Sequence, residues 1–305
     1  MSGGAERMRV ALTGATGTIG SRLLDALRAA GHDAVALARP GAGMDALRAK
    51  GVKVAGWDLD RPEVDPEVLR GVDAVLHLAA YIPPRMDDPA EAEPCLRRNA
   101  LGTLGLLRAA REAKVRRFVY FSSGQVYQRQ DRPVREDDPV YPAARAPYYL
   151  TSKLAGEVYA SHLGSTGSMD VAILRVASVY GPGCHGLVTR FLARAAAGEP
   201  IVVVNDGRYR VDLVFVDDVV DAAAKVLERR ATGIFNVGSG RGAAIRDVAE
   251  IALRLSGAHP SLVHSRPGPD DPGFSALDVG RAARELGYAP LSLEEGMARC
   301  AAVPV

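Results

Sequence analysis

Short apolar runs alternate with helical stretches along the first half of the chain, a pattern typical of a parallel sheet covered by helices on both faces. The runs are nearly continuous in apolar residues, as expected for strands that are buried on both sides. Helices are predicted at Ile19–Ala30 and at about 90–113. Six strands are predicted, at Met8–Thr13, Asp33–Ala38, Val52–Trp57, Asp73–Ala79, Arg116–Ser123 and Asp170–Ala177.

The pattern becomes less regular after residue 177. The elements expected there are a helix at 187–197, strands at Ile201–Val204 and Val211–Val216, and a helix from Asp217 toward Leu227. The segment FNVGS (235–239), a helix at about 244–255 and a Pro/Gly-rich stretch at 267–273 complete the chain. We therefore expect an α/β protein with a doubly wound parallel sheet of the Rossmann type at 1–175. A smaller, interleaved substrate-binding lobe is expected at 176–305, of which about 211–238 returns to the sheet domain.

Composition narrows the function classes. Hydrophobic residues make up 48% and charged residues 24% of the chain, which is ordinary for a globular protein. The net charge of +2 gives no reason to expect nucleic acid or an anionic membrane as partner. The three cysteines are far apart and suggest neither disulfides nor a zinc site, and no metal is expected. The start MSGGAER lacks the apolar core of a secretion signal, so a cytoplasmic location is expected.

A glycine-rich turn, TGATGTIG at 13–20, lies between the first predicted strand and the first helix. This is the setting in which such a turn binds the pyrophosphate of a dinucleotide. Gly14 permits the tight turn, Gly17 lets backbone N–H groups approach the phosphates, and Gly20 allows the helix to pack closely. The helix N-terminus adds a partial positive charge.

The end of the second predicted strand should lie beside the adenosine ribose. A carboxylate there would bind the 2′-hydroxyl, but the chain has Ala38 followed by Arg39. An arginine can pair with a 2′-phosphate, so NADP(H) is favoured, with NAD(H) as the alternative. Asp58 and Leu59 follow the third strand and are placed to meet the adenine, although Asp58 could equally be a turn residue.

The segment YYLTSK at 148–153 places Tyr149 and Lys153 four residues apart, and therefore on one face of a helix. A nearby ammonium would lower the pKa of the tyrosine and favour its phenolate. Such a tyrosine can exchange a proton with a substrate oxygen while a hydride moves at the attached carbon. Ser123, at the end of the fifth predicted strand, could hold the same oxygen. His77 is expected to serve packing and hydrogen bonding.

Taken together, these segments resemble the NAD-dependent epimerase/dehydratase family of extended short-chain dehydrogenases/reductases along nearly the whole chain. The resemblance rests on TGATGTIG, Asp58-Leu59, HLAA (77–80), NALGTLGLL (99–107), SSGQVY (122–127), YYLTSK, LRVASVYGPG (174–183), VFVDDVVDA (214–222) and ELGYAP (285–290).

The resemblance implies roles for individual residues. Ser123, Tyr149 and Lys153 would be the catalytic triad. The cofactor-binding residues would be Gly14, Thr16, Gly17, Thr18, Ile19, Gly20, Arg39, Asp58, Leu59, Leu78, Ala79, Ala80, Asn99, Tyr149 and Lys153. The substrate-binding residues would be Ser123, Gln125, Tyr149, Ser178, Arg210 and Arg266. Arg266 matches a position that binds the diphosphate of a nucleotide-linked sugar in many members, and the two long helices at 90–113 and 149–163 match the surface through which members form homodimers.

The leading hypothesis is hydride transfer at carbon 4 of a nucleotide-activated sugar, by a 4-epimerase or a 4-ketoreductase. Gly124 and Gln125 stand where dehydratases of the family carry an acidic pair, which argues against 4,6-dehydration. Many nucleotide-sugar members have Asn at Ser178 and Arg at Val211, to which Arg210 is adjacent. The missing Asn and the short substrate lobe favour an alternative, an NADPH-dependent reductase of a non-sugar carbonyl, whereas Arg266 opposes it. A non-catalytic cofactor-sensing protein is the alternative of another class.

Overall fold

The computed structural model describes residues 6–142, 145–259 and 263–302. The chain divides into two compact units, each built from several segments. The first unit comprises Met1–Gln128, Pro139–Arg175 and Val220–Phe235, and the second comprises Arg129–Asp138, Val176–Val219 and Asn236–Val305. The segment that returns to the first unit is therefore 220–235, shorter than the expected 211–238, and residues 129–138 belong to the second unit.

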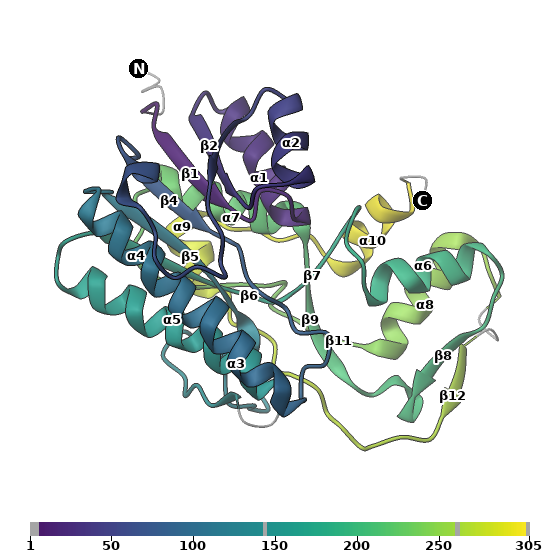
Figure 1. Ribbon diagram of the computed structural model, residues 1–305. Coiled ribbons are helices and arrows are strands. Elements are labelled where there is room, and N and C mark those ends of the chain that lie inside the picture. Colours follow the sequence, from purple (N-terminus) through teal and green to yellow (C-terminus); the bar gives the residue numbers. More distant parts are fainter. Residues whose placement is uncertain (1–5, 143–144, 260–262, 303–305) are drawn as a thin grey trace. The chain divides into compact units, whose positions relative to one another are not determined.

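The first unit is built on a seven-stranded sheet with the order β10-β6-β5-β4-β1-β2-β3 (Figure 1). Its strands are β1 (Arg9–Thr13), β2 (Asp33–Ala38), β3 (Lys53–Gly56), β4 (Ala74–His77), β5 (Arg117–Ser123), β6 (Asp170–Val176) and β10 (Gly233–Val237). The neighbours β3, β2, β1, β4 and β5 pair in parallel. All six strands expected in the first half are present, with ends that differ by a few residues, and the doubly wound α/β fold is confirmed.

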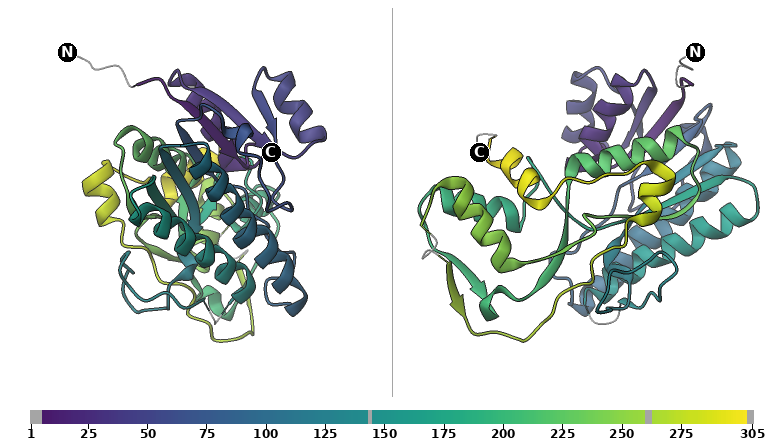
Figure 2. Two further views of the ribbon diagram at one scale, coloured as in Figure 1. Left: turned by 60° about the vertical axis from the view of Figure 1, so that its left-hand side comes forward. Right: turned by 180° about the vertical axis from the view of Figure 1, so that it is seen from behind.

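Helices cover both faces of this sheet, with α4 and α5 on one face and α1 and α7 on the other (Figures 1 and 2). The helices of this part are α1 (Thr18–Ala29), α2 (Ala42–Ala49), α3 (Ala92–Cys95), α4 (Gly102–Glu112), α5 (Pro147–Ser165) and α7 (Val216–Glu228). A core of apolar side chains, including Leu106, Phe118 and Ile173, lies between the sheet and the α4–α5 layer. The predicted helix at 90–113 is interrupted by a π-helical segment, Leu96–Leu101, between α3 and α4.

The second unit contains two small sheets packed with helices. Its elements are β7 (Ser178–Tyr180), α6 (Leu187–Ala196), β8 (Ile201–Val204), β9 (Arg210–Phe215), β11 (Gly242–Ala244), α8 (Ile245–Ser256), β12 (Val263–Arg266), α9 (Gly280–Leu286) and α10 (Leu293–Ala301). The strands form the sheets β11-β9-β7 and β12-β8. Phe191 of α6, Leu253 of α8 and Met297 of α10 pack against Leu213 and Phe215 of β9 to form its core.

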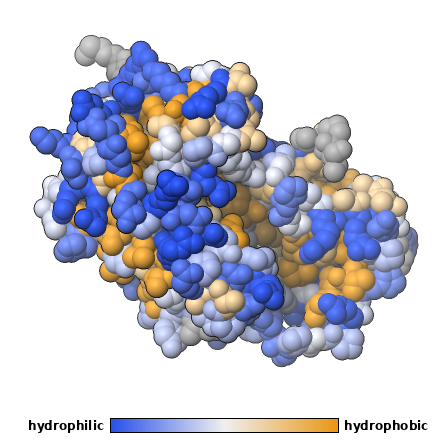
Figure 3. All heavy atoms as spheres, viewed as in Figure 1, coloured by the Kyte–Doolittle hydropathy of each residue, from blue (hydrophilic) through white to orange (hydrophobic). Residues whose placement is uncertain are grey.

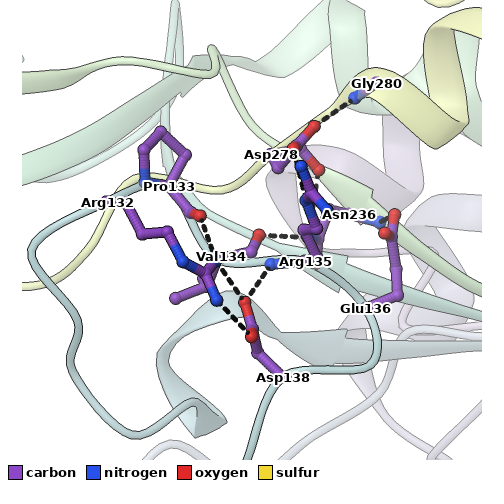
Figure 4. A network of polar contacts seen from close by, with 9 residues as sticks. All are labelled: Arg132, Pro133, Val134, Arg135, Glu136, Asp138, Asn236, Asp278 and Gly280. Atoms are coloured by element: carbon purple, nitrogen blue, oxygen red, sulfur yellow. Dashed lines mark hydrogen bonds and ion pairs between the residues drawn. The ribbon is translucent and has the colours of Figure 1, made fainter.

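Polar contacts attach residues 129–138 to the second unit (Figure 4). The side chain of Asn236 donates hydrogen bonds to the carbonyls of Val134 and Asp278, at 2.9 and 3.1 Å. Val134 also pairs with Leu277 in a short parallel bridge. Because these contacts join segments about 100 and 140 residues apart, no local sequence pattern indicates them. Within the described residues, no helix combines the length and apolar character that a membrane span requires.

Candidate active site

The glycine-rich turn connects β1 to α1, as predicted, and its glycines are required by close contacts. Gly14 has φ of +73°, and a Cβ there would lie 2.9 Å from the backbone nitrogen of Ala79. A Cβ on Gly20 would lie 2.1 Å from the carbonyl oxygen of Gly14, so only glycine lets α1 pack this closely. The N-cap of α1 is Gly17, which has no side chain to bind the first-turn N–H groups of Thr18, Ile19 and Gly20. This end of α1 therefore suits a phosphate.

Arg39 lies just beyond the end of β2 and is exposed to solvent. Helix α2, which was not expected from the sequence, begins three residues later. A Cβ on Gly43 of α2 would lie 3.2 Å from the side chain of Thr16, so the turn that carries Arg39 lies beside the glycine-rich turn. Asp58 follows β3, and its carboxylate accepts a hydrogen bond at 3.0 Å from the backbone N–H of Asp60. Asp58 therefore acts as a turn residue, one of the two roles considered for it from the sequence.

The backbone after β4 is fixed by Thr13, the last residue of β1. The Thr13 hydroxyl oxygen accepts hydrogen bonds from the backbone N–H groups of Leu78 and Ala79, at 3.1 and 3.0 Å. Its proton is then donated to Nδ1 of His77, 2.7 Å away, so Nε2 of His77 carries the ring proton. Burial lowers the pKa of His77 to about 3, so the ring is neutral. The expected packing and hydrogen-bonding role of His77 is confirmed.

Asn99 lies in the π-helical segment and is buried. Its amide binds the backbone of Tyr81 through two hydrogen bonds of 2.6 and 2.9 Å, just beyond Ala80. The same amide donates at 3.0 Å to the hydroxyl of Ser152, which donates in turn to the carbonyl of Tyr149. Asn99 thus connects the loop after β4 to the helix that carries the tyrosine.

Tyr149 and Lys153 lie one turn apart on α5, which begins with Pro147. Ser123 ends β5, and its hydroxyl oxygen accepts a hydrogen bond from the backbone of Gln125 at 3.2 Å. The sequence therefore correctly placed Tyr149 and Lys153 on one helix and Ser123 at a strand end of the same unit.

Burial shifts the pKa values of this pair toward the uncharged forms. Desolvation raises the pKa of Tyr149 to about 12, with a smaller contribution from Cys95. Desolvation lowers the pKa of Lys153 to about 7, opposed by the nearby carboxylate of Glu157. From the sequence alone, we expected the Lys153 ammonium to lower the pKa of Tyr149. In the structure the cost of burying a phenolate is larger, and a lysine with a pKa near 7 carries only part of a charge at neutral pH.

A cavity of about 350 Å³ lies within the second unit. Its walls come from β7, the loop before α6, the start of α6, and β9. The lining residues are Ser178, Val179, Tyr180, Cys184, Gly186, Leu187, Val188, Thr189, Tyr209, Val211, Leu213 and Ile245. The set holds hydroxyls and one thiol but no carboxylate, guanidinium or ammonium, so the cavity suits an uncharged group.

Of the three substrate residues expected in this unit, only Ser178 lines the cavity. Tyr209, Val211 and Leu213 alternate along β9 and face it. Arg210 lies between them on the opposite face and donates to the carbonyl of Gly242 at 2.6 Å. Arg210 therefore does not replace an arginine at Val211.

Arg266 ends β12 and is exposed, outside the cavity lining. Tyr209 and Ile245 were not expected from the sequence as lining residues, although the alternation that continues along β9 is a signal for Tyr209. The described residues contain no group of three or more His, Cys, Asp or Glu side chains arranged to hold a metal.

Comparisons with known proteins agree over most of the chain. The model of the NAD dependent epimerase/dehydratase family matches residues 10–238. A UDP-glucose 4-epimerase of Mycolicibacterium smegmatis is 33% identical, over 96% of this chain and 97% of its own length. Among solved structures, a UDP-glucose 4-epimerase of Thermotoga maritima with UDP-glucose has a TM-score of 0.82 and 26% identity, over 96% of this chain and 97% of the other. A dTDP-glucose 4,6-dehydratase of Streptomyces venezuelae with NAD bound has a TM-score of 0.81 and 30% identity, over 96% of both chains.

Proposed function

Because the chain belongs to the NAD-dependent epimerase/dehydratase family, and is thus an enzyme of the extended short-chain dehydrogenase/reductase type, we propose that it transfers a hydride at carbon 4 of a nucleotide-activated sugar. The observation that carries the proposal is the pair Tyr149 and Lys153 on α5, in the unit that also holds the glycine-rich turn and Ser123. The relatives named above, which act on UDP-glucose or dTDP-glucose by their names, support this substrate class.

The residues around α1 fit a dinucleotide. Gly14 and Gly20 leave a cradle that a Cβ would fill, and the uncapped N-terminus of α1 offers backbone donors to a pyrophosphate. We assign the remaining contacts to Asp58 and Leu59 for the adenine and to the backbone at 78–80 for the nicotinamide half. A bound dinucleotide would accept the hydride from the substrate carbon and return it.

Tyr149 is the proposed acid and base. Its phenol donates a proton to the substrate oxygen when a ketone is reduced, and takes it back when the alcohol is oxidised. A pKa near 12 favours the protonated phenol, so oxidation requires a positive charge beside Tyr149. Lys153, one turn away, supplies that charge when protonated and is also assigned to the nicotinamide ribose. Ser123 retains a hydroxyl proton for the same substrate oxygen.

Two outcomes share this machinery, and retention of the cofactor distinguishes them. A 4-epimerase must hold its dinucleotide between oxidation and reduction, whereas a ketoreductase exchanges it in each cycle. The test is to denature the purified protein, identify any dinucleotide released, and then assay UDP- and dTDP-hexoses. Retained dinucleotide with interconversion of 4-epimers establishes an epimerase. Reduction of a 4-keto sugar by added cofactor establishes a reductase, and inertness toward both substrate classes contradicts the proposal.

A second candidate is reduction of a non-sugar carbonyl. It is favoured by the uncharged cavity, in which Val211 and Ser178 stand where many nucleotide-sugar members have Arg and Asn. Turnover of a hydrophobic ketone together with inertness toward nucleotide sugars would select this function.

We propose NADP(H) as the preferred cofactor, on the basis of Ala38 and Arg39 at the end of β2. Gly43, four residues after Arg39 in the first turn of α2, lies close to the side chain of Thr16, which supports a position of Arg39 near the adenosine ribose. The dehydratase relative was solved with NAD, which supports the opposite preference. Titration with both dinucleotides decides between them.

A homodimer through the α4–α5 layer is also proposed. Leu96, Leu101 and Val158 on this layer are 54%, 40% and 59% exposed, and Figure 3 shows apolar atoms among hydrophilic ones on this face. Charged substitutions at Leu101 and Val158 should yield a monomer in light scattering, and a wild-type monomer contradicts the proposal.

We propose the cytoplasm as the location, since Cys95, Cys184 and Cys300 are all thiols.

A further inference from the structure

Three polar side chains form a row across adjacent strands of the central sheet. Thr13 of β1 is in register with His77 of β4, and His77 with Tyr120 of β5. All three are fully buried. The rings of His77 and Tyr120 lie 5.7 Å apart between centroids. The row therefore extends from the strand that leads into the glycine-rich turn to the strand that ends at Ser123.

Hydrogen bonds connect the members of this row to each other and to neighbouring helices. With Nδ1 accepting from Thr13, the Nε2–H of His77 donates to the hydroxyl of Thr103 on α4, at 2.9 Å. Thr103 also interacts with the hydroxyl of Tyr120 and opposes the rise that burial causes in the pKa of this tyrosine. Tyr120 then donates to the backbone carbonyl of Lys153, at 3.2 Å. This last hydrogen bond is made to the helical turn of α5 that carries Lys153, the candidate catalytic lysine.

Tyr120 also contacts Lys153 through its ring. The Nζ atom lies 4.4 Å from the ring centroid, within the range of a cation–π interaction. A Cβ on Gly156 would lie 2.4 Å from the Tyr120 hydroxyl, so glycine one turn along α5 allows this close approach. One buried tyrosine therefore contacts both the backbone and the side-chain nitrogen of Lys153.

We propose that Tyr120 is a positioning residue for Lys153, whose ring stabilises the ammonium and whose hydroxyl fixes the helical turn beneath it. Thr13, His77 and Thr103 hold Tyr120 in place and connect it to the backbone after β4. The proposal rests on the proposed function only in assigning Lys153 to the reaction, because the contacts themselves are independent of the substrate.

The other titratable groups near Lys153 do not take this role. Tyr149 and Glu157 share α5 with it, and His77 on β4 is neutral. Cys95 on α3 affects Tyr149, and burial raises the pKa of its thiol to about 11. Glu157 favours the ammonium but is hydrogen-bonded to Arg175. The aromatic face of Tyr120 is therefore the contact whose removal we expect to change the charge of Lys153.

The test measures the pKa of Lys153 directly, by NMR of the protein labelled with ¹³C at the lysine ε-carbons. The chain has five lysines, and only Lys153 is buried: the set is Lys50, Lys53, Lys114, Lys153 and Lys225. Spectra of Lys153→Met assign the signal. Tyr120→Leu keeps the site apolar but removes the ring that stabilises the ammonium. The midpoint of the Lys153 titration should therefore fall by roughly half a pH unit or more. Tyr120→Phe keeps the ring and should titrate near the wild type.

Phe118→Leu is the matched control, because Phe118 is buried on the same face of β5 and its ring also contacts His77, at 6.0 Å. It should lower the melting temperature without moving the Lys153 midpoint. A midpoint unchanged in Tyr120→Leu, or moved equally in Phe118→Leu, overturns the proposal. If Tyr120→Leu does not fold, Tyr120→Met carries the same expectation. Since the readout is independent of turnover, a wild type inert toward nucleotide sugars would reject the proposed function alone.

Discussion

The guanidinium of Arg175 forms hydrogen bonds to both carboxylate oxygens of Glu157, at distances of 2.8 to 3.2 Å. Both side chains are almost fully buried, with 5% and 3% of their surface exposed. Glu157 lies one turn after Lys153 on α5, and Arg175 near the end of β6 lies 4.6 Å from the ring centroid of Tyr127. The ion pair therefore fixes α5 against the sheet.

Breaking this pair should destabilise the protein strongly. Glu157→Gln leaves a buried guanidinium without its carboxylate, and the free energy of unfolding should fall by about 3 kcal/mol in urea titrations. The double variant Glu157→Leu/Arg175→Met removes both charges and should recover much of the loss. A double variant no more stable than Glu157→Gln would show that the ion pair is not what holds α5.

The neutral, buried His77 predicts a specific pH dependence. Its pKa is about 3 in the folded protein and about 6.5 when unfolded, so the unfolded state binds the additional proton between these values. Stability contributed by the neutral ring is therefore fully present above pH 6.5 and is lost as the pH falls, by about 1.4 kcal/mol per pH unit. The wild type should have a larger unfolding free energy than His77→Asn at pH 6.5. This difference should become smaller as the pH is lowered to 4. A constant difference across this range contradicts a buried neutral ring.

Local signals in the sequence identified the parts of the site that depend on local geometry. The positions of Gly14, Tyr149 and Lys153 could be read from spacing within one turn or helix. Helix α2 was missed because Pro40, Gly41 and Gly43 surround its start and weaken its pattern.

Other features depend on contacts between distant segments. The attachment of 129–138 to the second unit rests on Asn236 and on the bridge between Val134 and Leu277, which leave no local signal. The pKa of Tyr149 depends on burial, which a helical spacing does not reveal. By contrast, strict alternation along β9 places Arg210 opposite Val211, and that prediction was available from the sequence.

Gly20→Ala should weaken dinucleotide binding. The added Cβ would lie 2.1 Å from the Gly14 carbonyl, so α1 and the turn must separate and the phosphate cradle is lost. Dinucleotide affinity, followed by the fluorescence of Trp57, the single tryptophan, should fall at least ~10-fold, since 1.4 kcal/mol of lost binding suffices. Gly56→Ala is the control, because no heavy atom beyond its two chain neighbours lies within 4 Å of its added Cβ. Equal affinities for the two variants would argue against this turn as the phosphate site.

Arg39→Asp should reverse the cofactor preference. The carboxylate would repel a 2′-phosphate and could accept a hydrogen bond from a 2′-hydroxyl. NADPH affinity should fall by about 10-fold or more while NADH affinity is kept or improved, as measured by calorimetry. Arg48→Asp on α2 makes the same charge change in an exposed residue and should leave the affinities for NADPH and NADH unchanged. If Arg39→Asp and Arg48→Asp behave alike, Arg39 does not select the cofactor.

The most direct test of hydride transfer at carbon 4 uses UDP-glucose carrying deuterium at that carbon. The wild-type protein is incubated with this substrate and oxidised dinucleotide and is denatured during turnover, before the deuteride returns to the sugar. The reduced nicotinamide is then examined by mass spectrometry. We predict deuterium in the nicotinamide of the wild type and of Tyr148→Phe, and its absence in Tyr149→Phe, which lacks the proton-accepting hydroxyl. A wild-type nicotinamide without deuterium, under conditions where the dinucleotide and UDP-glucose are both bound, would contradict the assignment.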